Sequence, residues 1–206
     1  MTSARRTPVS ATPTRETPTR VTSARTTSVG GIGLARVGAA FGALVGVVAL
    51  AAAGGAHRPS VSAVDTSFVA DMAPHHALGV RMAALALRKA DDVRVREFGF
   101  TMARYQQAEF DQLTARAQRW RATPSEHIHG MLTDAEEQQL ASAEGAAFDR
   151  AWLQQMIRHH QGAVMMATDE TASGSDPETK TIAAFIVLTQ TKEIGQMQET
   201  LRDLGG

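Results

Sequence analysis

Two copies of one short motif, Met-x-x-His-His, carry the side chains in this sequence that are best suited to bind a metal. Imidazole nitrogen binds many transition metals, whereas thioether sulfur favours soft ions such as Cu(I). The chain has nine Met and no Cys, so thioether is its only soft ligand. The candidate ligands are Met72, His75, His76, Met82, Met156, His159, His160 and Met166. Their types predict a copper site, since zinc more usually recruits Cys or additional His and carboxylate.

Helical spacing places each motif on one stripe. An α-helix turns by about 100° per residue. On that basis, an arc of roughly 120° contains the aromatic, Met, His and Gly positions between Phe68 and Met82. The same arc contains the aromatic, Met, His and Ala positions between Trp152 and Met166. A stripe of that width normally faces the interior of a helical domain. Gly79 and Ala163 should leave room beside the histidines, and Met165 should point to the opposite face.

The helices that follow each motif carry one carboxylate apiece on their own apolar stripe. Glu109 and Glu193 occupy these positions. A carboxylate there is costly unless it is paired or binds a cation. We expect both to serve the histidines, either as hydrogen-bonded partners that orient the rings or as metal ligands.

A structural role for the same residues is the main alternative. Histidine on an apolar face is often a hydrogen-bonded core residue, and Met is a common core filler. A duplicated structural His pair would also occur twice. Two further histidines, His127 and His129, precede Met131 in the segment between the two units. They are either an exposed copper site or solvated side chains. Pro74 should kink its helix.

The elements that position these residues form an internal repeat. Residues 65–120 align without a gap on residues 149–204, at an offset of 84, and the shared positions are mostly polar or sulfur-bearing. Each unit reads as a helical hairpin. The expected helices are residues 65–89, a second ending near residue 120, one long helix over 134–172 opened by a Thr133–Glu136 capping box, and a last helix after the turn at 173–177.

Two hairpins predict an all-α, antiparallel four-helix bundle over residues 57–206. A different segment precedes it. Residues 1–36 are rich in Thr, Pro and Arg and are expected to be disordered. Residues 37–56 are 20 uncharged residues, a length that matches one bilayer crossing. They are either a transmembrane anchor or the core of a signal peptide cut near Ala56, and the long leader favours the anchor.

Charge and composition restrict the location and the partners. Residues 1–56 hold six Arg and one acid, whereas the remainder holds 15 basic and 20 acidic residues. The arginines should keep the N-terminal side in the cytoplasm, leaving the helical domain outside, either on a single-pass membrane protein or secreted. The acidic domain argues against nucleic acid as a partner. The candidate partners are the membrane through residues 37–56, a second copy of the chain and copper-handling proteins.

The sequence resembles the domain-of-unknown-function 305 (DUF305) family. The resemblance lies in residues 65–76 and 148–167, which contain the two motifs, and in residues 130–133 and 190–197. It implies a ferritin-like four-helix bundle in exported bacterial proteins, some of them linked to copper handling, with the Met/His face as its site. Arg81 and Leu113 stand where the second unit has Met165 and Met197. The resemblance therefore implies that the first unit either binds metal more weakly or mainly supports the fold.

These observations predict an extracytoplasmic protein that sequesters copper or maintains its homeostasis through His and Met ligands. A ferritin-like metal-dependent oxidoreductase is one alternative, although neither helical unit contains the Glu-x-x-His sequence of di-iron bundles. A structural or interaction bundle without metal is the other. We expect binding rather than catalysis, with His159, His160 and Met156 as the stronger ligands.

Overall fold

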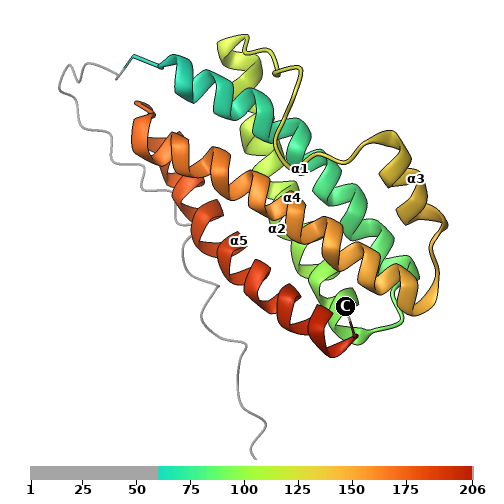
Figure 1. Cartoon of the computed structure of the whole chain (residues 1–206). Helices are drawn as coiled ribbons and strands as arrows, with labels where there is room; N and C mark the ends of the chain where they lie inside the picture. The colour runs from blue at the N-terminus through green and yellow to red at the C-terminus, as the bar shows by residue number, and fades with distance from the viewer. Residues whose placement is uncertain (1–59, 206) are drawn as a thin grey trace, which may run out of the picture. The chain divides into compact units, whose positions relative to one another are not determined.

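The computed structural model describes residues 60–205, and these residues form five helices and no strand (Figure 1). The helices are α1 (Ala63–Lys89), α2 (Val93–Trp120), α3 (Asp134–Ser142), α4 (Gly145–Ser173) and α5 (Pro177–Asp203). The prediction of an all-α domain is therefore confirmed for this part of the chain. The predictions of a disordered segment at 1–36 and of a membrane segment at 37–56 lie outside the described residues. Within residues 60–205, no helix combines the length and apolar character needed to cross a bilayer.

Side-chain caps fix where most helices begin. Ser62 and Asp65 form a reciprocal capping box at the start of α1, and Thr133 and Glu136 form another at the start of α3. Asp176 caps α5, in which Pro177 is the first residue. These caps satisfy backbone N–H groups that have no partner within the first helical turn. α1 continues through Pro74 as one helix.

The prediction of one long helix over 134–172 is wrong, because two separate helices, α3 and α4, occupy this range. α3 ends at Ser142, and Gly145 begins α4 with a φ of +58°. This left-handed conformation suits glycine, which has no Cβ to clash. The Thr133 capping box consequently opens a short helix of nine residues rather than the helix that carries His159.

The helices associate as two hairpins. α1 packs along α2, α4 packs along α5, and the two hairpins meet through α1 and α4, while α3 touches α4 (Figure 1). Ion pairs also join the outer helices at both ends. Arg94 in α2 contacts Asp203 near the end of α5, and Arg116 contacts Glu178 near the start of α5. α2 and α5 therefore run in opposite directions.

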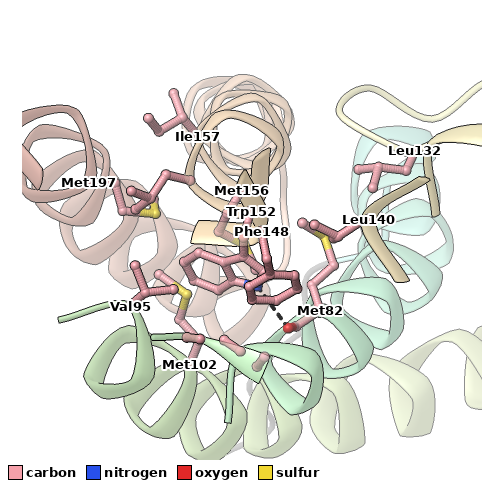
Figure 2. Packing of buried hydrophobic residues seen from close by; sticks show 14 of the residues in the cluster. Met82, Val95, Met102, Leu132, Leu140, Phe148, Trp152, Met156, Ile157 and Met197 are labelled. Atoms are coloured by element: carbon pink, nitrogen blue, oxygen red, sulfur yellow. Dashed lines mark hydrogen bonds between the residues drawn. The ribbon is translucent and has the colours of Figure 1, made fainter. Parts of the chain in front are cut away.

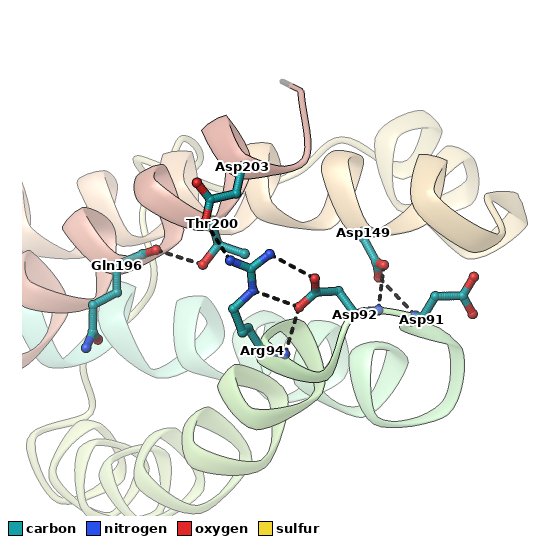
Figure 3. Close-up of polar contacts among 7 residues, drawn as sticks. All are labelled: Asp91, Asp92, Arg94, Asp149, Gln196, Thr200 and Asp203. Carbon is teal, nitrogen blue, oxygen red and sulfur yellow. Dashed lines mark hydrogen bonds and ion pairs between the residues drawn. The ribbon is translucent and has the colours of Figure 1, made fainter. Parts of the chain in front are cut away.

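The repeat produces two equivalent ties between the hairpins. Asp149 in α4 accepts hydrogen bonds from the backbone N–H groups of Asp91 and Asp92, at 3.2 and 2.8 Å (Figure 3). Asp65 in α1 accepts the corresponding bonds from Ser175 and Asp176, both at 2.9 Å. The first helix of each unit thus binds the turn of the other unit. These hydrogen bonds at both ends hold α1 and α4 antiparallel and in register.

Two apolar clusters fill the interior. One surrounds Trp152, whose indole N–H donates to the backbone oxygen of Met82 at 2.8 Å (Figure 2). The other surrounds Phe68 and Met72. Along α1, His75 and His76 fall between residues of the second cluster and residues of the first. The same alternation occurs in α4, so the histidines form a polar layer within an apolar core.

Glu170 is a buried carboxyl without a counterpart in the first unit, where Ala86 stands. No N–H or O–H donor of the described residues reaches its carboxyl oxygens. Burial, followed by the neighbouring Asp65 carboxylate, raises the pKa of Glu170 to about 8. The pKa of Asp65 is instead lowered to about 2, because its hydrogen bonds to Asp176, Ser62 and Ser175 outweigh its burial. At neutral pH, Glu170 is therefore protonated beside an ionised Asp65.

Replacement of Glu170 by Gln is expected to make the protein less sensitive to alkaline pH. A carboxyl whose pKa rises from 4.5 to about 8 on folding stabilises the folded state less as pH increases through that range. At about 1.4 kcal/mol per pKa unit, the loss has an upper limit of about 5 kcal/mol. Urea unfolding at pH 6 and pH 9 would measure the part of this loss that falls above pH 6, which has an upper limit of about 3 kcal/mol. Equal losses of unfolding free energy in the wild type and in Glu170→Gln would contradict this account.

Candidate metal centre

The four motif histidines come together in the interior. His75, His76, His159 and His160 are each 0% exposed. The rings of His75 and His159 stack with their centroids 3.7 Å apart and their planes 12° apart. His76 and His160 flank this stack, at 6.0 Å from His75 and 6.1 Å from His159 respectively. The structure therefore joins the two motifs, which are 84 residues apart, in one layer.

One nitrogen of each stacked ring donates to a backbone oxygen. His75 Nε2 lies 3.1 Å from the carbonyl oxygen of His159, and His159 Nδ1 lies 3.3 Å from the carbonyl oxygen of Gly130. A carbonyl oxygen can only accept, so each of these ring nitrogens carries the proton. The opposite nitrogens, Nδ1 of His75 and Nε2 of His159, are then unprotonated.

The flanking rings use a carboxylate instead. His76 Nε2 lies 2.7 Å from Oε2 of Glu109, and His160 Nε2 lies 2.9 Å from Oε2 of Glu193. These carboxylates come from α2 and α5, the second helix of each unit. The structure thus places both predicted Glu residues against their histidines. A carboxylate in this position fixes the ring and increases the basicity of its other nitrogen.

The second nitrogen of every ring is buried without a hydrogen-bond partner among the described residues. These atoms are His75 Nδ1, His76 Nδ1, His159 Nε2 and His160 Nδ1. Native proteins leave few buried polar atoms unpaired, because each carries a desolvation penalty of roughly 1–3 kcal/mol. Four unpartnered imidazole nitrogens in one layer fit the requirement of a metal for nitrogen ligands.

Electrostatics keep the stacked rings neutral. Burial is the largest cause that lowers the pKa of His75 and of His159 well below the ordinary value. The neighbouring histidines add to the effect, since positive charges so close together repel one another. A neutral imidazole keeps the lone pair that coordination requires.

Gly79 allows another polar side chain to reach the layer. A Cβ at this position would overlap Oε1 of Gln106 and lie 3.0 Å from Nε2 of His159. Both amide atoms of Gln106 are buried without hydrogen-bond partners among residues 60–205. The room expected beside the histidines is therefore occupied, in the first unit, by the amide of Gln106.

The predicted thioethers divide into two sets. Met72 belongs to the cluster around Phe68, while Met82 and Met156 belong to the cluster around Trp152. Met72 and Met156 each precede a histidine by one helical turn, a spacing at which side chains are neighbours. Met166 differs, because it is only partly buried and lines a surface pocket.

The described residues contain no group of three or more His, Asp or Glu side chains arranged to hold a metal ion. The stacking of His75 on His159 explains why the unpaired nitrogens of these two rings do not point toward one common position. Imidazole lone pairs lie in the ring plane, so two nearly parallel rings direct their lone pairs along parallel planes. A single ion could use both His75 and His159 only after one ring turned.

Two residues that position the layer are not among those predicted. Gly130 in the linker has a φ of +78° and supplies the oxygen that holds His159. Gly162 lies inside α4, where a Cβ would overlap the backbone oxygen of His129. A glycine inside a helix is destabilising, so its position beside the His pair was a signal of close backbone approach.

The sequence differences between the units fall mostly outside this layer. Arg81 is exposed and pairs with Glu137, and its counterpart Met165 is 44% exposed on the opposite face, as predicted. Leu113 and Met197 are both fully buried. Burial of the histidines does not distinguish the two units, so the stronger second unit stays a prediction.

Comparison with known proteins identifies similar chains. The model of the DUF305 family matches residues 65–201. A DUF305 protein from Streptomyces coelicolor, a predicted secreted protein, is 28% identical with a TM-score of 0.64, covering 69% of this chain and 94% of that one. A DUF305 fragment from Deinococcus radiodurans is 31% identical with a TM-score of 0.63, covering 70% and 99%.

A third similar structure is CopM in its Cu(I)-bound form. It is 32% identical with a TM-score of 0.59, covering 69% of this chain and 98% of that chain. CopM has also been solved in Cu(II)-bound and Ag-bound forms. No curated protein sequence matches this chain significantly.

Proposed function

The chain belongs to the DUF305 family, and from this premise we propose that it is an extracytoplasmic metal-binding protein that sequesters copper. The observation that carries the proposal is the layer of four buried imidazoles, each with one ring nitrogen that has no hydrogen-bond partner within residues 60–205. Coordination would give these nitrogens the partner they lack. Binding would be reversible coordination by His and Met side chains.

The choice of copper rests on the thioethers and on the relatives. Met72 and Met156 lie one helical turn from His76 and His160, and the chain has no Cys. Mixed imidazole and thioether ligands suit Cu(I), and imidazole also accepts Cu(II). The Cu(I)-, Cu(II)- and Ag-bound forms of CopM, at 32–34% identity, support the same choice.

The carboxylates would act through the rings rather than on the metal. Glu109 and Glu193 already accept hydrogen bonds from the Nε2–H groups of His76 and His160. Each carboxylate therefore holds its imidazole with Nδ1 toward the interior. Such partners typically improve metal affinity by roughly 10- to 100-fold.

We also infer the finer architecture and the location. The two hairpins meet through α1 and α4, and ion pairs join α2 to α5 at both ends. These contacts support an antiparallel four-helix bundle of the ferritin-like class. The predicted secreted relative supports a position outside the cytoplasm. Residues 37–56 would provide the anchor or the signal peptide, and copper-handling proteins would be the partners.

Titration of the full-length chain with Cu(I), Zn(II) and Fe(II) tests this function. We expect Cu(I) to bind most tightly, measured by competition with a colorimetric Cu(I) chelator. Met72→Leu/Met156→Leu should weaken Cu(I) binding by about ten-fold or more and leave Zn(II) binding unchanged. Both changes roughly conserve volume, so each should cost less than about 1.5 kcal/mol of stability.

Met165→Leu is the matched control, because Met165 lies on the outer face of the same helix. It should bind Cu(I) like the wild type. Tighter binding of Zn(II) than Cu(I), or equal Cu(I) affinity in the wild type and the double variant, would disprove the copper assignment. Oxygen-dependent turnover with iron would instead support a ferritin-like oxidoreductase.

A further inference from the structure

A surface pocket lies between α1 and α4, beneath the linker that joins the two units. Its volume is about 440 Å³. The linker contributes His127 and His129, α4 contributes Met166 and Asp169, and α1 contributes Asp71. Two imidazoles, one thioether and two carboxylates therefore line one cavity that is open to solvent.

The linker is held in place on both sides of its histidines. Before them, the backbone N–H and the hydroxyl of Ser125 donate to the carboxylate of Asp71, at 2.6 and 2.8 Å. After them, Gly130 and Gly162 bring the linker backbone into close contact with α4. The segment between these contacts is short, so the two imidazoles stay at the pocket rather than moving freely in solvent.

The side chains that line this pocket have different tasks. Asp71 uses both oxygens on Ser125, so it holds the linker. His127, His129 and Asp169 are exposed, and no hydrogen bond of their side chains occurs within the described residues. Met166 packs partly against the apolar cluster around Phe68 and also lines the pocket. Two imidazoles and one thioether thus line the same pocket as the carboxylate of Asp169.

We propose that this pocket is a second, solvent-facing copper site, in which His127, His129 and Met166 bind Cu(I) and Asp169 supplies negative charge. The proposal rests on the proposed copper-binding function and extends it to residues outside the buried layer. Imidazole with thioether is the same soft ligand set, here placed where an ion can bind without opening the core.

Within residues 60–205, the second unit has a site of this kind and the first unit has no equivalent. Met82, the counterpart of Met166, is 1% exposed, and the linker occurs once. The linker also touches the buried layer, because Gly130 holds the ring of His159. An ion in the pocket would therefore lie on the segment that orients one of the buried ligands. This arrangement suits a site that receives copper at the surface before the buried layer does.

The number of Cu(I) ions bound by the full-length chain tests the proposal. We expect His127→Ala/His129→Ala to bind one Cu(I) fewer than the wild type in a chelator competition, and Met166→Leu to weaken the same ion. Glu126→Ala is the matched control, an exposed change in the same linker that does not line the pocket. Ag(I), which does not change oxidation state, serves as a second probe. Thermal unfolding verifies that each variant is folded.

A variant of the buried layer separates this proposal from the function on which it rests. His75→Gln/His76→Gln/His159→Asn/His160→Gln should keep the pocket ion and lose the others. Wild-type stoichiometry in the linker variant, or an equal loss in Glu126→Ala, would overturn the pocket site alone. Loss of all binding in the linker variant, with full binding in the layer variant, would support the pocket and overturn the buried site. Absence of Cu(I) binding in the wild type would overturn both.

Discussion

Removal of only the unpaired nitrogens from the four buried imidazoles is expected to abolish tight Cu(I) binding by the layer. The variant is His75→Gln/His76→Gln/His159→Asn/His160→Gln. Glutamine places an N–H near the position of Nε2, and asparagine places one near Nδ1. Each substitution therefore keeps the observed donor to a carbonyl or carboxylate oxygen and deletes the ligand atom. Affinity should fall by more than the roughly 10- to 100-fold associated with loss of an outer-shell partner.

The same variant separates a metal role from a structural one. If the imidazoles serve only the core, the retained hydrogen bonds should leave both stability and Cu(I) affinity close to wild type. If they bind copper, affinity falls while thermal unfolding of the metal-free protein changes little. Chelator competition and thermal unfolding measure the two quantities on one sample. If the variant binds as many Cu(I) ions as the wild type, with equal affinity, the layer is structural.

The two double variants contained in this variant also test the prediction that the second unit binds Cu(I) more strongly than the first. His159→Asn/His160→Gln should reduce Cu(I) affinity more than His75→Gln/His76→Gln. The structure gives both pairs the same burial and a corresponding carboxylate. An equal loss in the two half-variants would contradict the prediction that the second unit binds more strongly.

Replacement of Trp152 by alanine is expected to have the largest effect on stability. Trp152 is 0% exposed and lies at the centre of the larger apolar cluster, and its indole N–H donates to Met82 (Figure 2). Aromatic-to-alanine changes in a core typically cost about 3–5 kcal/mol. The orphaned carbonyl oxygen of Met82 adds roughly 1–3 kcal/mol. We expect a loss near the upper end of the aromatic range, measured by urea unfolding at pH 7.

Leu188→Ala is the control for this change. Leu188 is 71% exposed, so its truncation should alter the unfolding free energy by no more than about 0.5 kcal/mol. A loss below 1 kcal/mol in Trp152→Ala would mean that the cluster around Trp152 does not support the fold as the structure indicates. Because Trp152 lies one turn before Met156, copper binding should be compared only at temperatures where the variant is folded.

The sequence alone determined the helical class, the repeat and the identity of most of the predicted interior residues, with Met166 as the exception. These features depend on local properties, namely spacing of apolar side chains, capping residues and Pro or Gly at turns. The first two helices and the last one accordingly begin and end close to where they were expected. The pairing of Glu109 and Glu193 with histidines followed from the cost of burying an unpaired carboxylate.

Only the tertiary structure decided how these residues meet. The break before Gly145 depends on a left-handed backbone angle that composition does not reveal. The stack of His75 on His159 arises because each hairpin binds the turn of the other, which brings α1 and α4 together. The protonated nitrogen of each ring is chosen by oxygens from distant segments, including Gly130 in the linker. A motif of Met and His thus specifies the ligands, whereas long-range contacts specify which lone pairs remain free to bind.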